Sequence, residues 1–223
     1  MTGKQLSLPE ITTHEEWDAT RRKLLAKEKE LTRMQDALAA ERRRLPMVTV
    51  EENYTFTGPE GELSLIDLFH GRRQLIVYSA MLEPGAAPCT GCSMVMDNIG
   101  HNLAHVNARD TTFVFTSPAP QEEIKALQKR MGWNAPWYTD PGRRFADAFG
   151  AGKGFAVNVF IRDDAGRVYR TYYTTARGGE LFDTNFRLLD LTPYGRQEEW
   201  EDSPAGWPQT PLYQWWRLHD EYH

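Results

Sequence analysis

Cysteine is scarce in this sequence: Cys89 and Cys92 are the only two among 223 residues. Long apolar runs are also missing, so no segment is expected to cross a membrane. The first residues are polar and lack the charged stretch followed by an apolar one that marks a secretion signal. We therefore expect a cytoplasmic protein. In a reducing compartment, a single cysteine pair indicates redox chemistry or metal binding rather than a structural disulfide.

Basic charge is not in excess either. The 26 Lys and Arg residues are outnumbered by 31 Asp and Glu residues, which gives a net charge of -5. Nucleic-acid binding usually needs a basic surface, so we expect no nucleic-acid partner. With 40% hydrophobic residues the chain can bury one core. We divide it into an N-terminal helical arm (1–46), a central domain (47–195) and a C-terminal tail (196–223) packed on that domain.

The two cysteines form a Cys-x-x-Cys motif within Pro88-Cys89-Thr90-Gly91-Cys92. The apolar run 75–79 predicts a strand before the motif, and the spacing of apolar residues in 93–99 predicts a helix after it. Cys89 then lies at a helix N-terminus, where unpaired N–H groups and the helix dipole favour the thiolate. In such places a thiol pKa falls from about 8.5 into roughly the 3.5–7.5 range. Cys92, one turn further on, can close a disulfide with Cys89.

The arm is predicted to be one long helix over about residues 14–45. Thr13-His14-Glu15-Glu16 has the spacing of a capping box, and Pro46 ends the segment. Apolar residues recur every seven positions, at Trp17, Leu24, Leu31, Leu38 and Leu45. The positions between them are too polar for a complete coiled-coil seam. The stripe indicates either an arm packed along its own domain or a helix that also joins a homodimer.

The rest of the chain predicts alternating strands and helices. Strands are expected at 48–56, 75–79, 111–116, 155–161 and 168–175, with turns at 58–61 and 163–166; helices are expected at 63–69, 90–99, 121–131, 143–149 and 181–191. From residue 75 onward the order is β-α-β, then α, then β-β-α, which is the thioredoxin arrangement. We therefore predict an α/β protein with a thioredoxin-like mixed sheet flanked by helices. A Trp-rich C-terminal tail, with Trp207, Trp215 and Trp216, is expected to cover a sheet edge.

Several segments together resemble a known bacterial family. They are the arm EEWDATRRKLLAKEKELTR with ERRRLP, YTFTGPEGELSLIDLFHGRRQLIVY, VNARDTTFVFTS, KRMGWNAPW, YYTTARG, LLDLTPYGR and HDEY. This set is similar to the thioredoxin-like family called domain of unknown function 899, a relative of the peroxiredoxins. The resemblance implies a thioredoxin-like fold and a redox pair at Cys89 and Cys92, and it implies no particular activity. Similar sequences tend to have His where Ser79 stands and Arg where Pro118 stands, so two polar neighbours of the thiols are missing here.

Four interpretations of the cysteine pair stay open. In dithiol–disulfide exchange, Cys89 attacks a substrate disulfide and Cys92 resolves the mixed disulfide. In peroxide reduction, Cys89 becomes a sulfenic acid and Cys92 condenses with it, although the motif Pro-x-x-x-Thr-x-x-Cys of peroxiredoxins is absent. Cys89, Cys92, His101 and His105 also approach the spacing of a zinc or copper site, although a continuous helix would separate Cys92 from His101 by about 13.5 Å. In the fourth, the domain is a binding module whose cysteines are idle.

Four further residues are candidates for supporting the cysteines: Arg177, Arg109, Thr90 and Ser79. Arg177 follows the last predicted strand, from where it could lower a thiolate pKa. We expect no cofactor, and a disulfide or peroxide on a protein or a small molecule as substrate; the electron donor stays open. The cis-proline of thioredoxins is missing before the strand at 156, where Phe155 stands.

Overall fold

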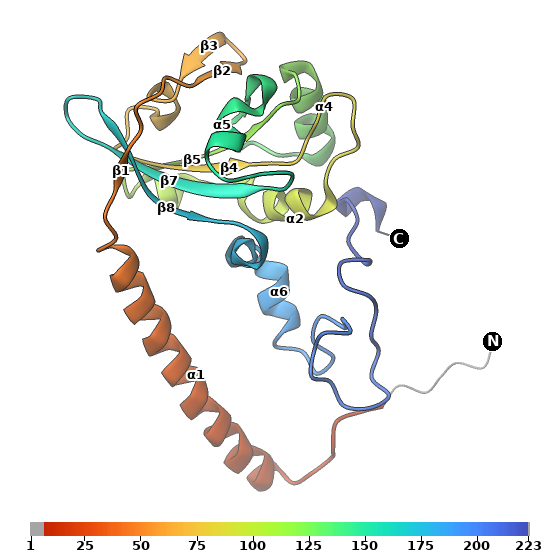
Figure 1. Ribbon diagram of the computed structural model, residues 1–223. Coiled ribbons are helices and arrows are strands. Elements are labelled where there is room, and N and C mark those ends of the chain that lie inside the picture. The colour runs from red at the N-terminus through yellow and green to blue at the C-terminus, as the bar shows by residue number, and fades with distance from the viewer. Residues whose placement is uncertain (1–6, 223) are drawn as a thin grey trace.

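The computed structural model describes residues 7–222 and contains one eight-stranded mixed sheet. Its strand order is β1-β8-β7-β4-β5-β6-β2-β3 (Figure 1). The strands are β1 (Val48–Thr49), β2 (Thr55–Gly58), β3 (Gly61–Ser64), β4 (Gln74–Ser79), β5 (Thr111–Ser117), β6 (Trp137–Thr139), β7 (Ala156–Arg162) and β8 (Val168–Thr174). The β4–β5 and β5–β6 pairs are parallel, and the other neighbours are antiparallel.

The helices connect these strands in the predicted order. They are α1 (His14–Arg42), α2 (Thr90–Ile99), α3 (Ala104–Asn107), α4 (Gln121–Met131), α5 (Arg144–Ala148) and α6 (Thr184–Leu189), with 3-10 helices η1 (Asp67–Phe69), η2 (Pro141–Arg143), η3 (Ala176–Phe182) and η4 (His219–Glu221). The crossover from β4 through α2 to its parallel neighbour β5 places the Cys-x-x-Cys motif at the carboxyl end of β4. The predicted thioredoxin-like α/β class is confirmed.

The two faces of the sheet carry separate cores. Alternate residues of a strand point to opposite faces, so Leu75 and Val77 of β4 join a cluster with η1 and α5. Tyr78 points the other way and joins a cluster built from α2 and α4. Burying one large apolar side chain stabilises the fold by about 1.5–3 kcal/mol, so both faces hold the central strands in place. The end of β4, which leads to the motif, is therefore fixed on both sides.

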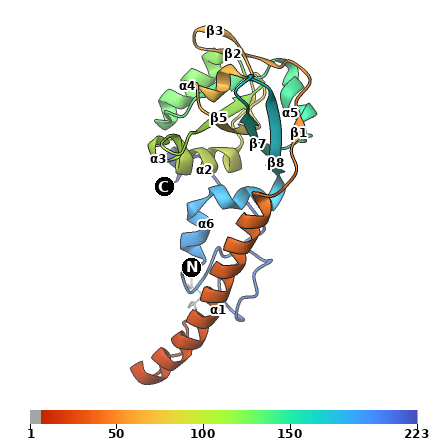
Figure 2. The ribbon, with the colours of Figure 1, turned by 90° about the vertical axis from the view of Figure 1, so that its left-hand side faces the viewer.

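Helix α1 begins at the predicted capping box and extends away from the sheet (Figures 1 and 2). Thr13 accepts a hydrogen bond from the backbone N–H of Glu16. None of residues 14–42, all of which the structure describes, is buried. The stripe residues Trp17, Leu24, Leu31 and Leu38 are 46–55% exposed. An arm packed along its own domain is therefore the wrong interpretation, and a homodimer through α1 stays a prediction.

The C-terminal tail was predicted to cover a sheet edge, and this is wrong. The sheet edges are β1 and β3, whereas the tail lies beside α2, α4 and α6. His219 bonds Asp97 of α2, and Asp220 pairs with Arg130 of α4 at 2.7 Å. The apolar tail side chains thus cover the helix that carries the cysteines.

Two predicted helices differ from the observed elements. Residues 63–69 form the end of β3 and the short η1, because the hairpin register pairs Thr55 with Ser64. The expected helix 181–191 is divided into η3 and α6, because Asp183 adopts an extended backbone and caps α6. The three-residue strand β6 was not predicted. Within residues 7–222, the structure contains no helix that is both long and apolar enough to span a membrane.

Candidate functional site

The two cysteines occupy different places at the start of α2. Cys89 is the N-cap residue, and its Sγ accepts a hydrogen bond from the backbone N–H of Cys92 at 3.4 Å. N-cap positions usually carry an oxygen that fills this role, and a negative sulfur fills it with the added attraction of the helix dipole. Cys89 is partly exposed, whereas Cys92 is buried. An incoming molecule therefore reaches Cys89 first.

The surroundings of Cys89 favour its thiolate. The Cys92 thiol donates to Cys89, and the backbone N–H groups of Cys92 and Gly91 act in the same direction, whereas burial opposes them. Together they lower the pKa of Cys89 to about 6. At pH 7 a thiol with that pKa has about ten thiolates for each protonated group.

Cys92 has the opposite electrostatics. Its hydrogen bond to Cys89, its burial and the negative charge of Cys89 raise the pKa of Cys92 well above its ordinary value. Two donors nevertheless point at its sulfur: the Tyr78 hydroxyl at 3.6 Å and the Met81 backbone N–H at 3.5 Å. These donors oppose the increase, and two of its three causes, the hydrogen bond to Cys89 and the negative charge of Cys89, depend on the state of Cys89.

A cavity of about 290 Å³ opens beside Cys89. Its walls are mostly apolar and include Val95, Phe155, Phe186, Tyr213 and Trp216. Phe155 stacks on Tyr78 with 5.2 Å between ring centroids, and Gly179 of η3 approaches the same phenyl ring so closely that a Cβ would lie 2.5 Å from it. The residue that stands at the cis-proline position is thus a wall of this cavity.

The supporting candidates lie at different distances from the thiols. Thr90 is the first residue of α2, and Arg177 lines the cavity with its guanidinium bonded to Glu180 at 2.8 Å. Ser79 is buried, and its hydroxyl accepts from Thr116. Arg109 precedes β5, at the end of the sheet opposite the motif, and its carbonyl accepts from Thr111. The structure therefore brings Thr90 and Arg177 to the site and leaves Ser79 and Arg109 away from it.

The arrangement that a metal site would need is not formed in the part of the chain that the structure describes. Helix α2 does end at Gly100, ahead of His101, but both His101 and His105 are exposed. Residues 7–222 contain no group of three or more His, Cys, Asp or Glu side chains that could hold a metal ion. The two cysteines and the two histidines therefore do not come together as ligands of one metal ion.

Three contributors to the site were not predicted from the sequence. Tyr78 was counted as a strand residue, yet its hydroxyl donates to Cys92. Trp216 was counted as a packing residue of the tail and Tyr213 was not singled out, yet both line the cavity. The one available signal for Tyr78 was its place at the end of the strand before the motif, and no local signal marks the two tail residues.

Comparison with known proteins finds one family model and several solved structures to which parts of this chain are similar. A family model described as "Bacterial protein of unknown function (DUF899)" matches residues 6–222. Peroxidoxin BcpB from Mycobacterium tuberculosis is 18% identical with a TM-score of 0.45, covering 60% of this chain and 86% of that one. Peroxiredoxin Q from Xanthomonas campestris is 15% identical with a TM-score of 0.41, covering 60% and 90%. A proposed thiol:disulfide interchange protein, DsbE from Chlorobium tepidum, is 13% identical with a TM-score of 0.41, covering 65% and 97%. No curated protein matches the chain.

Proposed function

The chain belongs to the bacterial family of unknown function DUF899, and we propose that it is a thiol–disulfide oxidoreductase with Cys89 as nucleophile and Cys92 as resolving thiol. The observation that carries this proposal is the opposite perturbation of the two neighbouring sulfurs. Cys89 is accessible and has a pKa near 6, whereas the pKa of the buried Cys92 is raised. One sulfur is thus ready to attack while the other keeps its proton.

In the first step the Cys89 thiolate attacks one sulfur of a substrate disulfide. A bond forms between Cys89 Sγ and that sulfur, the substrate S–S bond breaks, and the second substrate sulfur leaves as a thiolate that takes a proton from solvent. The enzyme then carries a mixed disulfide. The hydrogen bond from the backbone N–H of Cys92 holds the attacking sulfur at the N-terminus of α2.

The second step follows from a change of charge at Cys89. In the mixed disulfide Cys89 no longer carries the negative charge that raised the pKa of Cys92. Its sulfur is also no longer a charged acceptor for the hydrogen bond from the Cys92 thiol. The Tyr78 hydroxyl and the Met81 N–H remain aimed at Cys92 Sγ and stabilise its thiolate. Cys92 loses its proton to solvent and attacks Cys89, which releases the second substrate thiol and leaves a Cys89–Cys92 disulfide. Formation of the mixed disulfide thus activates the resolving cysteine.

The cycle closes when an external dithiol reduces the Cys89–Cys92 disulfide with two electrons. In total, one substrate disulfide and one external dithiol give two substrate thiols and one external disulfide. The balance requires two electrons from the donor, which one dithiol or two molecules of a monothiol such as glutathione would supply.

The test uses the full chain with dithiothreitol, glutathione or thioredoxin with its reductase as donor, and with a small disulfide or hydrogen peroxide as oxidant. We expect disulfide reduction that is lost in Cys89→Ser. Cys92→Ser should accumulate the mixed disulfide, visible as a mass increase on Cys89. Turnover retained in Cys89→Ser would refute the assignment of the nucleophile. Peroxide consumption without disulfide reduction would replace the proposed activity by peroxide reduction.

A further inference from the structure

The C-terminal tail closes the approach to the cysteines. The Trp216 ring lies against Gly91, one of the two residues between the cysteines, so closely that a Cβ on Gly91 would be 2.6 Å from the ring. Tyr213 packs on Trp216 with 4.1 Å between ring centroids, and both residues line the cavity at Cys89. A folded protein that presents a disulfide needs open surface around the attacking sulfur. Here two aromatic side chains of the same chain occupy that surface.

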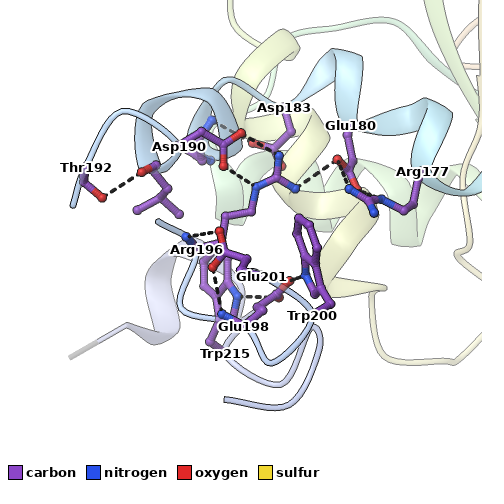
Figure 3. Close-up of polar contacts among 12 residues, drawn as sticks. Arg177, Glu180, Asp183, Asp190, Thr192, Arg196, Glu198, Trp200, Glu201 and Trp215 are labelled. Atoms are coloured by element: carbon purple, nitrogen blue, oxygen red, sulfur yellow. Dashed lines mark hydrogen bonds and ion pairs between the residues drawn. The ribbon is translucent and has the colours of Figure 1, made fainter. Parts of the chain in front are cut away.

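The tail is held in this position by a buried carboxylate. Glu198 is 1% exposed, and its oxygens accept from the indole N–H groups of Trp200 at 2.6 Å and Trp215 at 2.8 Å (Figure 3). The same carboxylate accepts from the backbone N–H of Tyr213 at 2.9 Å. A buried carboxylate with three donors is well satisfied, and removing them would leave a costly buried charge. Glu198 therefore anchors the tail on both sides of the cavity cover, at the backbone of Tyr213 and at the Trp215 indole next to Trp216.

A second set of contacts joins the tail to η3 and α6. Arg196 pairs with Glu180 at 3.0 Å and with Asp190 at 2.8 Å (Figure 3). Glu180 also binds Arg177, which stacks on Trp200. The wall of the cavity formed by η3 and the cover formed by the tail are thus connected by one ion-pair network.

The charges of the cavity disfavour an anionic ligand. Among the residues that line it, negative charge comes from Cys89, Glu180 and Asp183. Positive charge comes from Arg177, whose guanidinium is already bound to Glu180. A ligand that carries carboxylates would face apolar walls and the negative charge of the Cys89 thiolate. The one arginine among the lining residues, Arg177, is already paired with Glu180 and does not offset that charge. The remaining lining is aromatic and aliphatic, which suits a neutral apolar molecule.

We propose that the cavity is the substrate site for a compact, uncharged, apolar disulfide, and that the tail excludes protein disulfides. The volume of about 290 Å³ lies near the lower end for small-ligand sites, so the substrate is compact. Cys89 reaches the sulfur of such a ligand from one wall while the aromatic rings hold its substituents. This inference rests on the proposed function, because it names the substrate class of the same two-step exchange.

The first experiment compares two chromogenic aromatic disulfides of similar reactivity and different charge. They are 2,2'-dithiodipyridine, which is neutral, and 5,5'-dithiobis(2-nitrobenzoate), which carries two negative charges. Each rate with the reduced full chain is divided by the rate with dithiothreitol at the same pH, which removes the intrinsic reactivity of the reagent. We expect the normalised rate to favour the neutral reagent by at least about tenfold, since two charges within a few ångströms interact strongly at low effective dielectric. Equal normalised rates would overturn the proposed substrate class and leave the exchange activity intact.

The second experiment tests the cover with insulin as a protein disulfide. Wild-type protein should reduce insulin slowly, and Trp216→Ala should reduce it at least about fivefold faster, because the surface at Gly91 becomes open. The matched control is Trp207→Ala, since Trp207 belongs to the same tail but packs edge to face against Tyr194 and does not line the cavity. If Trp216→Ala does not fold, Tyr213→Ala opens the same surface. Fast reduction of insulin by the wild type, or the same increase in Trp207→Ala, would overturn exclusion by the tail.

A binding measurement separates this inference from the proposed function. Cys89→Ser cannot begin the exchange, so calorimetry with 2,2'-dithiodipyridine reports occupancy of the cavity alone. Saturable binding that is lost in a Cys89→Ser, Trp216→Ala double variant supports the site even if no turnover is found. Absence of binding to Cys89→Ser overturns the site, whatever the wild-type protein reduces.

Discussion

Replacing Cys92 tests which contact makes Cys89 acidic. The Cys92 thiol is the largest single cause of the lowered pKa of Cys89. Cys92→Ala removes that donor, whereas Cys92→Ser replaces it with a hydroxyl that can also donate. Both variants keep the backbone N–H of residue 92, which also points at Cys89. The comparison therefore isolates one hydrogen bond from the remaining effect of the helix N-terminus.

The magnitude decides which quantity should be measured. Lowering the pKa from about 8.5 to about 6 raises the thiolate fraction at pH 7 by roughly 30-fold. A less basic thiolate is also a weaker nucleophile, and with a Brønsted slope near 0.45 the same change costs roughly 13-fold in rate per thiolate. The net gain at pH 7 is then only about two- to threefold. A single rate at neutral pH is therefore a weak test, and the pH midpoint of the reaction is a strong one.

The assay is alkylation of Cys89 by iodoacetamide between pH 4.5 and 9.5, with the modified residue identified by peptide mass. We expect a midpoint at about pH 6 in the wild type. Cys92→Ser should stay near that value, and Cys92→Ala should move upward toward the ordinary pKa of a thiol. A wild-type midpoint near 8.5 would refute the thiolate at Cys89, since that is about the value for an unperturbed cysteine. Identical midpoints in the two variants would refute the role of the Cys92 thiol.

Four further predictions concern the stability of the fold. Gly91→Ala should displace Trp216 and lower the free energy of unfolding by about 1–3 kcal/mol, and unchanged urea unfolding would show that the two residues are not in contact. Gly132→Ala places a side chain at φ 68°, beyond α4, and should cost about 1 kcal/mol by the same measurement; a neutral result would contradict this backbone conformation. Asp140→Ala removes the acceptor of the backbone N–H groups of Phe145 and Ala146 and should cost about 1–3 kcal/mol, with Asp140→Asn milder because it keeps one oxygen. Deleting residues 1–45 should lower the thermal midpoint by less than about 4 °C, because α1 buries no side chain, and a larger decrease would mean that the arm is packed in solution.

The central part of the fold could be predicted because its signals are local. The run 75–79, the motif at Cys89 and the spacing of Ile124, Leu127 and Met131 each specify an element without reference to the rest of the chain. The position of Cys89 at a helix start also follows from its immediate neighbours. For the same reason the general form of the reactive site, an exposed thiol ahead of a shielded one, was available from the sequence.

The cover of the site could not be predicted, because it depends on contacts between distant residues. Trp216 contacts Gly91, although more than half of the chain separates the two residues in the sequence. The residues next to either one give no indication of this contact. Glu198 reads as one more charged residue in a polar segment, yet it is among the most deeply buried groups of the protein. The hydrophobic stripe of α1 led to a different error, since periodicity predicts an apolar face and does not specify what covers it.

Helix α1 lies between two points at which the chain contacts the rest of the protein. Its 29 residues span about 43 Å at 1.5 Å per residue. At one end the chain continues into β1, where Val48 pairs with Arg170 of β8, and at the other end the Ser7 carbonyl accepts from the Tyr194 hydroxyl at 3.0 Å. The helix therefore bridges the edge of the sheet and the far side of the region that follows α6. Deleting residues 1–45 would therefore also remove the contact between Ser7 and Tyr194, which links the start of the described chain to the region that follows α6.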